Sequence, residues 1–397
     1  MTSAVSQPLR IGVIGLGRAF TLMLSTFQRD PRVRLVAACD PVATATTQFS
    51  RDFGGQVHAS AEALCADPAV ELVYIASPHQ FHCQHVLIAA ASGKHVLLEK
   101  PMAITVDECT RMVDAMQSAG RALIVGHSHS FDGPALLARA LIDRGEIGRV
   151  GMINALNFTD FLYRFRRPEE LDTARGGGVV HSQAAHQVDV VRMLGGGMLS
   201  KVRAATAQWD KTRPSEGAYS ALLTFTDGAF ASLAYSGYGH FDSDEWMGWR
   251  GELGTARSAA DYGAARHRLN AVGDVAEEVA AKAARNYGGS DWQPANDSPA
   301  AHQHFGPVVV SGERGDLRLM ADGVWVYGDR ERRFEALPAP TIPRREVIDE
   351  LWAVLREGAL ALHDGRWARA TTEASLAILT SAREGRDIDL QWQVPWR

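Results

Sequence analysis

Two glycines near the start of the chain follow an apolar run and precede a helix-like segment. The run is Leu9–Ile14, and Gly15 and Gly17 come directly after it in LRIGVIGLG. Backbone without a side chain can turn tightly there, and the free N–H groups at a helix N-terminus attract a pyrophosphate. The third small residue of the usual GxGxxG pattern would fall at Phe20, so either the helix starts differently or Ala19 takes the close-packing role. By itself, the turn is equally compatible with an ordinary strand-to-helix connection.

An acidic residue ends the second apolar run. Asp40 follows RLVAAC, where a carboxylate can accept hydrogen bonds from both ribose hydroxyls of an adenosine. Its charge would repel a 2′-phosphate, and neither of the next two residues is basic. Turn and carboxylate together predict NAD as the cofactor rather than NADP. The predicted cofactor contacts of this segment are Gly15, Gly17, Arg18, Ala19, Phe20 and Asp40.

Polar residues also follow the next two apolar runs. Ser77, Pro78, His79 and His82 come after LVYIA, and we interpret them as cofactor contacts, because ligands bind at the carboxyl ends of parallel strands. His79, His82 and His85 do not predict a metal site, since His79 and His85 would lie on different faces of a helix and no HExxH or Cys₂His₂ spacing occurs. No metal is expected.

The tripeptide Glu99-Lys100-Pro101 ends the run KHVLL. That position predicts Lys100 beside the nicotinamide, and Glu99 as a group that orients Lys100 or the cofactor amide. A partly buried lysine next to a cationic ring has a lowered pKa and can accept or relay a proton near neutrality. The alternative is a surface lysine paired with Glu99.

These motifs carry a resemblance to a known family. The glycine turn, the tripeptide at 76–78, His82, the Glu-Lys-Pro element and GGGVVHSQAAHQVD at 176–189 resemble the glucose-fructose oxidoreductase, inositol dehydrogenase and rhizopine catabolism (Gfo/Idh/MocA) family of NAD(P)-dependent oxidoreductases. The resemblance spans most of the chain and includes SAREGRDIDL near its end. It implies a Rossmann domain followed by a second domain with an open sheet, and catalysis by hydride transfer.

The resemblance also implies roles in the second glycine motif. Family members usually carry an Asp four residues before a His, and here Ser182 stands at the Asp position and His186 at the His position. The loss of that carboxylate makes His186 the leading general base, with Lys100 as its partner in a proton relay. The alternative for His186 is a helix histidine that packs against its neighbours.

Cationic residues surround this motif in the sequence. Arg164 and Arg166 lie in YRFRR shortly before the triple glycine, and His127 and His129 are spaced so that both face one side of an extended segment. Guanidinium groups bind carboxylates in a bidentate manner, so the pattern predicts an anionic substrate; a solvated loop is the alternative. The predicted substrate contacts are His127, His129, Arg164, Arg166, His181, Ser182 and Gln183.

Within the family, YRFRRPEELDTARGGGVVHSQAAHQVDVVRMLGG and HFGPVVVSGERGDLR resemble the phthalate 4,5-cis-dihydrodiol dehydrogenases. The resemblance implies NAD-dependent oxidation of a carboxylated aromatic cis-dihydrodiol to a catechol, with a proton relay through Lys100 and His186. Two alternatives stay open. One is a sugar or inositol dehydrogenase, disfavoured by Ser182 and the arginines. The other is a non-catalytic NAD(P)-sensing regulator, disfavoured because both Lys100 and His186 are present.

The order of apolar runs predicts two domains. Strand-like and helix-like segments alternate over residues 1–127, which predicts a doubly wound parallel sheet of the Rossmann type. Residues 128–397 predict a substrate-binding and oligomerisation domain of the α+β class with a large open, mostly antiparallel sheet, in which Asp227-Gly228 and Asp322-Gly323 mark hairpins. A stretch at about 242–303 is interpreted as an insertion or lid.

Composition excludes several other classes of protein. The chain has 397 residues, a net charge of −5, 46% hydrophobic residues and four cysteines without a CxxC pair. These values predict no disulfide scaffold, no nucleic-acid partner and no membrane association. The N-terminus lacks an apolar signal region, so we expect a cytoplasmic protein. An open sheet has a face to cover, which predicts a homodimer or homotetramer.

Overall fold

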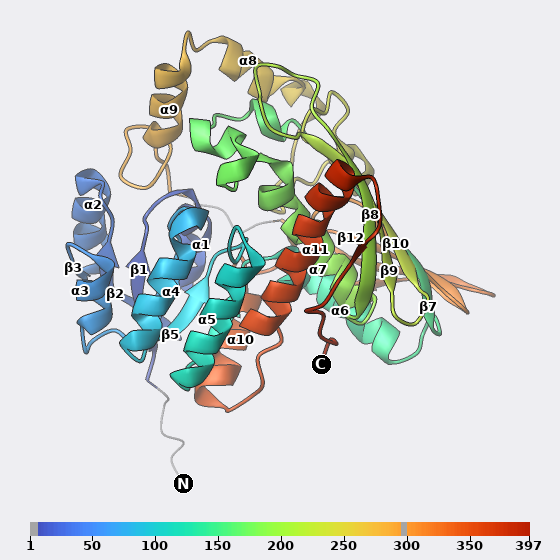
Figure 1. The fold of residues 1–397 in the computed structure, drawn as a ribbon, viewed down its shortest axis with the longest axis horizontal. Helices are drawn as coiled ribbons and strands as arrows, with labels where there is room; N and C mark the ends of the chain where they lie inside the picture. Colours follow the sequence, from blue (N-terminus) through green and yellow to red (C-terminus); the bar gives the residue numbers. More distant parts are fainter. Residues whose placement is uncertain (1–6, 295–299) are drawn as a thin grey trace. The chain divides into compact units, whose positions relative to one another are not determined.

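The computed structural model describes residues 7–294 and 300–397 and divides the chain into two compact units (Figure 1). Unit 1 contains Met1–His127, Lys282–Asp297 and Ile342–Arg369, and unit 2 contains Ser128–Ala281, Ser298–Thr341 and Ala370–Arg397. Residues 1–6 of the predicted first domain and 295–299 of the predicted insertion lie outside the described residues.

Unit 1 is built on a six-stranded sheet of order β3-β2-β1-β4-β5-β6 in which every neighbouring pair is parallel. Its strands are β1 (Leu9–Ile14), β2 (Val33–Cys39), β3 (Gln56–Val57), β4 (Leu72–Ile75), β5 (His95–Leu98) and β6 (Leu123–Val125). Its helices are α1 (Arg18–Arg29), α2 (Ala43–Phe53), α3 (Ala61–Ala66), α4 (His82–Ala91), α5 (Val106–Ser118) and α10 (Arg345–Arg356). This is the predicted doubly wound arrangement.

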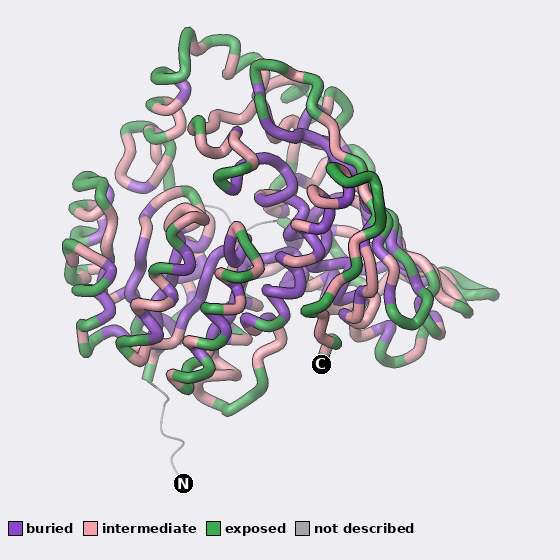
Figure 2. Tube along the Cα trace, viewed as in Figure 1, coloured by how far each residue is buried: buried purple, intermediate pink, exposed green. Residues whose placement is uncertain are grey.

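The core of unit 1 explains why its strands lack polar alternation. All four residues of β4 are buried, as are three of the four in β5, and Figure 2 shows the central strands as buried segments between partly exposed helices. Strands covered on both faces need apolar side chains on both. Helix starts follow the usual capping rules: the side chain of Thr105 accepts a hydrogen bond from the N–H of Glu108 at the start of α5.

Two segments from late in the chain belong to unit 1, whereas the sequence placed all residues after 127 in a second domain. Tyr287 is buried, and its hydroxyl donates to Asp52 at 2.7 Å. In α10, Val347, Ile348 and Leu351 form the buried face. Contacts across such long sequence separations leave no local pattern in the chain.

Unit 2 is built on a nine-stranded sheet of order β14-β13-β12-β11-β7-β10-β9-β8-β15. Only β7 and β10 pair in parallel, so the sheet is mixed and mostly antiparallel, as predicted. The two Asp-Gly pairs lie where β9 turns into β10 and β12 turns into β13. The strands are β7 (Val150–Phe158), β8 (Leu199–Ala207), β9 (Ala218–Phe225), β10 (Phe230–Ser236), β11 (Val308–Gly312), β12 (Gly315–Met320), β13 (Gly323–Gly328), β14 (Arg332–Ala336) and β15 (Ile388–Asp389).

The helices of unit 2 include one that is buried throughout. Every residue of α7 (Ala185–Leu194) is buried, and a π-helical turn, Val180–Ala184, precedes it. The other helices are α6 (Gly133–Asp143) and α8 (Ala264–Asn270), while the division between the units falls within α9 (Val275–Ala284) and α11 (Gly365–Glu384). Among the helices that the structure describes, none has the length and apolar character needed to cross a membrane.

Candidate active site

The glycine turn of unit 1 has the backbone geometry that a pyrophosphate needs. Gly15 has a φ of +94°, and a Cβ there would lie 2.8 Å from the backbone of Ala76 and Ser77. Nothing lies within 4 Å of the position of a Cβ on Gly17, which is the N-cap of α1. Open space at the N-terminus of a helix suits an anion. Arg18, the first residue of α1, is exposed beside it.

Asp40, which directly follows β2, stabilises the glycine turn between β1 and α1. Its Oδ2 accepts from the backbone N–H of Leu16 at 2.6 Å, and its Oδ1 accepts from that of Val42 at 2.8 Å. The carboxylate therefore fixes the turn between β1 and α1 in addition to the predicted role at the ribose, which stays a prediction.

Phe20 avoids the expected crowding by packing away from the turn. Its side chain is fully buried and meets the ring of Tyr287 edge-on at 5.1 Å between ring centroids. A residue far along the chain thus accepts the bulk at the position where the usual pattern has a small residue, and Ala19 stays half-buried. Because the side chain of Phe20 is fully buried, the structure does not support a cofactor contact through that side chain.

His82 links two loops at the carboxyl ends of β4 and β5. Its Nε2 lies 2.9 Å from the carbonyl oxygen of Ser77, and its Nδ1 lies 3.0 Å from that of Pro101. Burial lowers its pKa to about 4, although these carbonyls act in the opposite direction. Both ring nitrogens face the main chain, so His82 positions the loops rather than facing a cofactor. His79 forms a ring contact with His82 at 5.7 Å between ring centroids. The hydroxyl oxygen of Ser77 lies 2.9 Å from Nδ1 of His85, a contact that the sequence did not predict.

Glu99 is engaged inside unit 1. The hydroxyl of Tyr74 donates to its Oε1 at 2.6 Å, and burial raises the pKa of this carboxyl against the opposing charge of Arg344. Lys100 follows it, half-buried, just past the end of β5, and the Lys100–Pro101 peptide is cis. The structure thus gives Glu99 two partners that no sequence motif predicted. The placement of Lys100 at the carboxyl end of a central strand is as expected.

In unit 2, two imidazoles lie against each other beside carboxylates. The ring centroids of His129 and His186 lie 4.6 Å apart, and both rings contact the ring of Phe305. Nδ1 of His129 lies 2.5 Å from Asp132, and its Nε2 lies 3.6 Å from Glu252. Burial alone would lower the pKa of His129, but the two carboxylates outweigh it and raise the pKa. His127 is also buried but belongs to unit 1.

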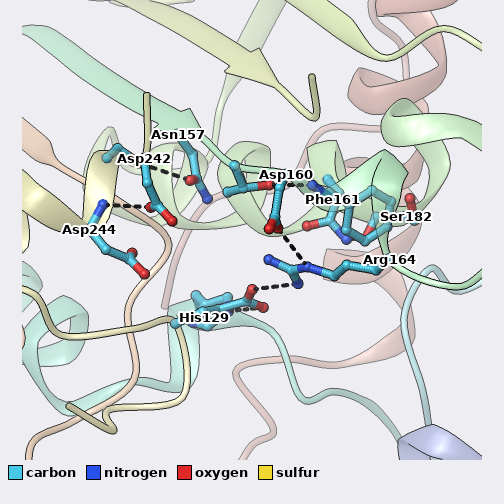
Figure 3. Close-up of polar contacts among 12 residues, drawn as sticks. His129, Asn157, Asp160, Phe161, Arg164, Ser182, Asp242 and Asp244 are labelled. Atoms are coloured by element: carbon cyan, nitrogen blue, oxygen red, sulfur yellow. Dashed lines mark hydrogen bonds and ion pairs between the residues drawn. The ribbon is translucent and has the colours of Figure 1, made fainter. Parts of the chain in front are cut away.

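The two predicted arginines differ in their partners. Nε of Arg164 donates to Asp160 at 3.2 Å and its Nη1 lies 4.0 Å from Glu252, and Figure 3 shows its guanidinium between Asp160 and His129. Arg166 instead stacks on the ring of Phe161, 3.6 Å from the centroid, and donates to the Phe161 carbonyl at 2.7 Å. No carboxylate in the described part of the chain forms an ion pair with Arg166, and its buried Nε has no hydrogen-bond partner there. Burial lowers the pKa of Arg166 to about 10, which leaves it a cation at neutral pH.

The second glycine motif forms the start of the buried helix. Glu216 accepts a hydrogen bond from the N–H of Val180 at 3.0 Å and another from the hydroxyl of Thr173. Its carboxylate fills the space above Gly178, where a Cβ would lie 2.2 Å from Oε1. Burial raises the pKa of Glu216. Glycine is needed here because a buried carboxylate caps the turn.

The three predicted contacts in this turn are held by their neighbours. The hydroxyl of Ser182 donates to the Gly178 carbonyl, and Gln183 receives the hydroxyl of Tyr235 at 3.4 Å. Burial lowers the pKa of His181 to about 4, so it is neutral near pH 7. A π-helical turn of this kind is common at functional sites.

Asp189 anchors the buried helix α7 to neighbouring segments. It accepts hydrogen bonds from the hydroxyls of Ser130 and, at 2.6 Å, of Thr371. Since Ser130 follows His129 directly and Asp189 lies one turn after His186, this carboxylate holds the segments that carry the two imidazoles.

Sequence reasoning missed the acidic groups of unit 2. Asp242 and Asp244 both bind Arg257 at 2.6 Å, and Figure 3 shows these two carboxylates near Asn157. Burial raises the pKa of Asp244 to about 6. Asp160 and Glu252 lie beside Arg164 of the predicted basic cluster. Glu252 comes from a segment far along the chain, so no local spacing could have revealed its approach to Arg164.

Both parts of the chain match models of known protein families. Residues 9–127 match the oxidoreductase family with an NAD-binding Rossmann fold, and residues 135–257 match the Gfo/Idh/MocA C-terminal domain. A 1-carboxy-3-chloro-3,4-dihydroxycyclohexa-1,5-diene dehydrogenase from Comamonas testosteroni is 47% identical over 378 residues, 94% of this chain and 95% of that protein.

Two further relatives show how far the similarity extends. A crystal structure described as a dehydrogenase from Bordetella bronchiseptica RB50 has a TM-score of 0.90 at 40% identity and covers 96% of this chain and 100% of that one. An inositol 2-dehydrogenase from Pseudomonas syringae is 30% identical over 190 residues, 47% of this chain and 54% of that protein. The chain belongs to the Gfo/Idh/MocA family of oxidoreductases, with an NAD-binding Rossmann domain.

Proposed function

We propose that this protein oxidises a carboxylated aromatic cis-dihydrodiol to the corresponding catechol with NAD as the hydride acceptor. The observation that carries the proposal is the 47% identity, over nearly the whole of both chains, to a dehydrogenase whose named substrate is a carboxylated, chlorinated cyclohexadiene diol. A phthalate-type dihydrodiol, with two ring carboxylates, is the finer assignment that the sequence motifs favour.

Arg166 is the residue that we assign to the substrate carboxylate. Arg164 is already paired with Asp160 and approaches Glu252, whereas no carboxylate in the described residues pairs with Arg166. Its guanidinium is held flat against Phe161, and an oriented guanidinium loses little freedom when it binds a planar carboxylate.

The residues of unit 1 fit the cofactor. The open position at Gly17, the N-terminus of α1 and the carboxylate of Asp40 are the groups that would hold the pyrophosphate and the adenosine ribose. When bound, NAD⁺ supplies the acceptor for the hydride that leaves a carbinol carbon. We assign Lys100 and His186 to the hydroxyl proton, which must leave as the C–H bond breaks.

The chemistry of the substrate lowers the demand on these bases. Loss of a hydride and a proton from one carbinol gives a hydroxy-ketone in the ring, and transfer of one ring proton to the ketone oxygen gives the catechol. Aromatisation makes the overall oxidation favourable, so a base of modest strength suffices.

A second candidate function is oxidation of a sugar or inositol. The carboxylates of Asp160, Asp242, Asp244 and Glu252 favour it, because such groups accept hydrogen bonds from polyol hydroxyls. The match to inositol 2-dehydrogenase covers about half of each chain. An uncharged polyol would not need the guanidinium of Arg166, which forms no ion pair with any carboxylate among the described residues.

A steady-state screen distinguishes the candidates. NADH formation would be followed by absorbance with NAD⁺ and three substrate classes: carboxylated cis-dihydrodiols, inositols and hexoses. We expect turnover with a carboxylated dihydrodiol and a catechol as product. Preferential turnover of an inositol or hexose would replace the proposal with the second candidate, and tight NAD⁺ binding without turnover of any class would favour a regulator.

A further inference from the structure

Three side chains of unit 2, one of which is the proposed base His186, bring together a set of possible metal ligands. One ligand atom each from His129, His186 and Glu252 lies within 4.8 Å of the other two. Nε2 of His129 is 3.6 Å from Oε1 of Glu252. Two ligands of a tetrahedral zinc ion, at bond lengths near 2.0–2.1 Å, are separated by about 3.4 Å. The separation between His129 and Glu252 therefore already suits an ion, and the separations to His186 are at most 4.8 Å.

Asp132 supplies the outer contact that metal-bound histidines usually have. Its Oδ2 lies 2.5 Å from Nδ1 of His129, and both residues are buried. A carboxylate on the far nitrogen fixes the ring orientation and the tautomer, so that the other nitrogen presents its lone pair to an ion. In this chain that other nitrogen is the one nearest Glu252.

Packing holds the two imidazoles in place. The ring of Phe305 contacts His129 at 5.2 Å and His186 at 5.0 Å between ring centroids. Asp189 anchors the neighbouring segments through Ser130 and Thr371. The third ligand is more accessible, because 33% of the Glu252 side chain is exposed. Two fixed ligands and one accessible ligand leave a route by which an ion can enter.

The charge of the surrounding groups independently favours a cation. Asp132, Asp160 and Glu252 carry three negative charges, and Arg164, which contacts the last two, carries one positive charge. Without the imidazoles, these four groups have a surplus of two negative charges. A divalent cation neutralises that surplus, which would otherwise oppose the binding of an anionic substrate.

We propose that His129, His186 and Glu252 form a binding site for a divalent first-row metal ion, with Zn²⁺ as the best match to two nitrogens and one carboxylate. Three protein ligands leave a coordination position open, as in catalytic zinc sites. The role of the ion rests on the proposed function: the adjacent hydroxyl oxygens of a cis-diol would coordinate it, and coordination lowers the pKa of a hydroxyl group. With the ion bound, His186 would serve as a ligand, and Lys100 alone would accept the hydroxyl proton. The sequence predicted no metal because its three ligands are far apart along the chain.

Metal content tests the site without any substrate. The full chain would be purified, desalted, analysed for bound metals by mass spectrometry, and then titrated with Zn²⁺ and with Co²⁺, whose visible absorption reports a tetrahedral N/O environment. We expect about one bound ion per chain and intense Co²⁺ bands. Glu252→Gln, which removes the accessible ligand, should weaken binding by about 100-fold, and His129→Gln should do the same.

Glu245→Gln is the matched control, because Glu245 is an exposed acidic residue in the same stretch of unit 2. It should bind Zn²⁺ like the natural chain. Failure of the natural chain to bind micromolar Zn²⁺ or Co²⁺ would overturn the proposal, as would binding that survives Glu252→Gln and His129→Gln in variants with native circular dichroism. Metal binding without dihydrodiol oxidation would overturn the proposed function alone. Full activity after complete metal removal would overturn the role in diol binding.

Discussion

At the scale of single residues, several side chains serve the backbone as much as they serve a ligand. Asp40, expected at the ribose, also accepts hydrogen bonds from two backbone N–H groups of the turn. His82, expected at the cofactor, bridges the carbonyls of two loops. Their positions in the chain could be predicted because strand ends are readable from apolar runs. Their partners could not, because they come from other loops.

Replacing Asp40 with Ala tests its double role. The variant loses the acceptor for the N–H groups of Leu16 and Val42 as well as the predicted ribose contact. We expect the dissociation constant of NADH, measured by fluorescence titration, to rise by about 10- to 100-fold, since a hydrogen bond to a charged group contributes about 1.5–3 kcal/mol.

Asp107→Ala is the control for that measurement, because Asp107 is an exposed aspartate at the start of α5 in the same unit. It should bind NADH normally. Unchanged NADH affinity in Asp40→Ala would show that the carboxylate neither shapes the turn nor contacts the ribose.

At the scale of elements, the strands and most helices follow from pattern. Helices α2 and α5 lie among the helix-like segments expected within residues 1–127, because apolar periodicity and, for α5, a capping threonine mark them. The buried helix α7 was harder to predict, because polar residues such as Gln187, Asp189 and Arg192 are buried in it together with the apolar ones, so polarity marks no exposed face. The acid that caps this helix, Glu216, comes from just before β9.

Glu216→Ala tests that cap. It leaves the buried N–H of Val180 without its acceptor, which costs about 1–3 kcal/mol. We expect a lower free energy of unfolding in urea and faster hydrogen exchange over residues 179–186, the segment that carries His181, Ser182 and Gln183.

The exposed Glu331 provides the comparison, since Glu331→Ala removes the same group from the surface of unit 2. Hydrogen exchange at 179–186 should not respond to that change. Equal exchange in Glu216→Ala and the natural chain would contradict the capping role.

At the scale of the whole molecule, net charge was a poor guide to the site. A chain of net charge −5 with arginines before its triple glycine predicts a basic pocket for an acid. In unit 2, Arg164 is accompanied by Glu252 from a distant segment and by Asp160 from four residues earlier in the chain. Arg166 is the member of the cluster that keeps its guanidinium without an ion pair in the described residues. The family was predictable from local motifs, whereas the electrostatics of the site required the fold.

The most direct test of the account compares two substrates in two proteins. The natural chain and Arg166→Met would be assayed for kcat/KM with a carboxylated cis-dihydrodiol and with its analogue lacking the carboxylate, and Arg330→Met would serve as the exposed control. We predict that the natural chain and the control prefer the carboxylated diol by about 100-fold or more, and that Arg166→Met loses most of this preference while its activity on the analogue is little changed. Equal kcat/KM for the two substrates in the natural chain, or an undiminished preference in Arg166→Met, would contradict the account.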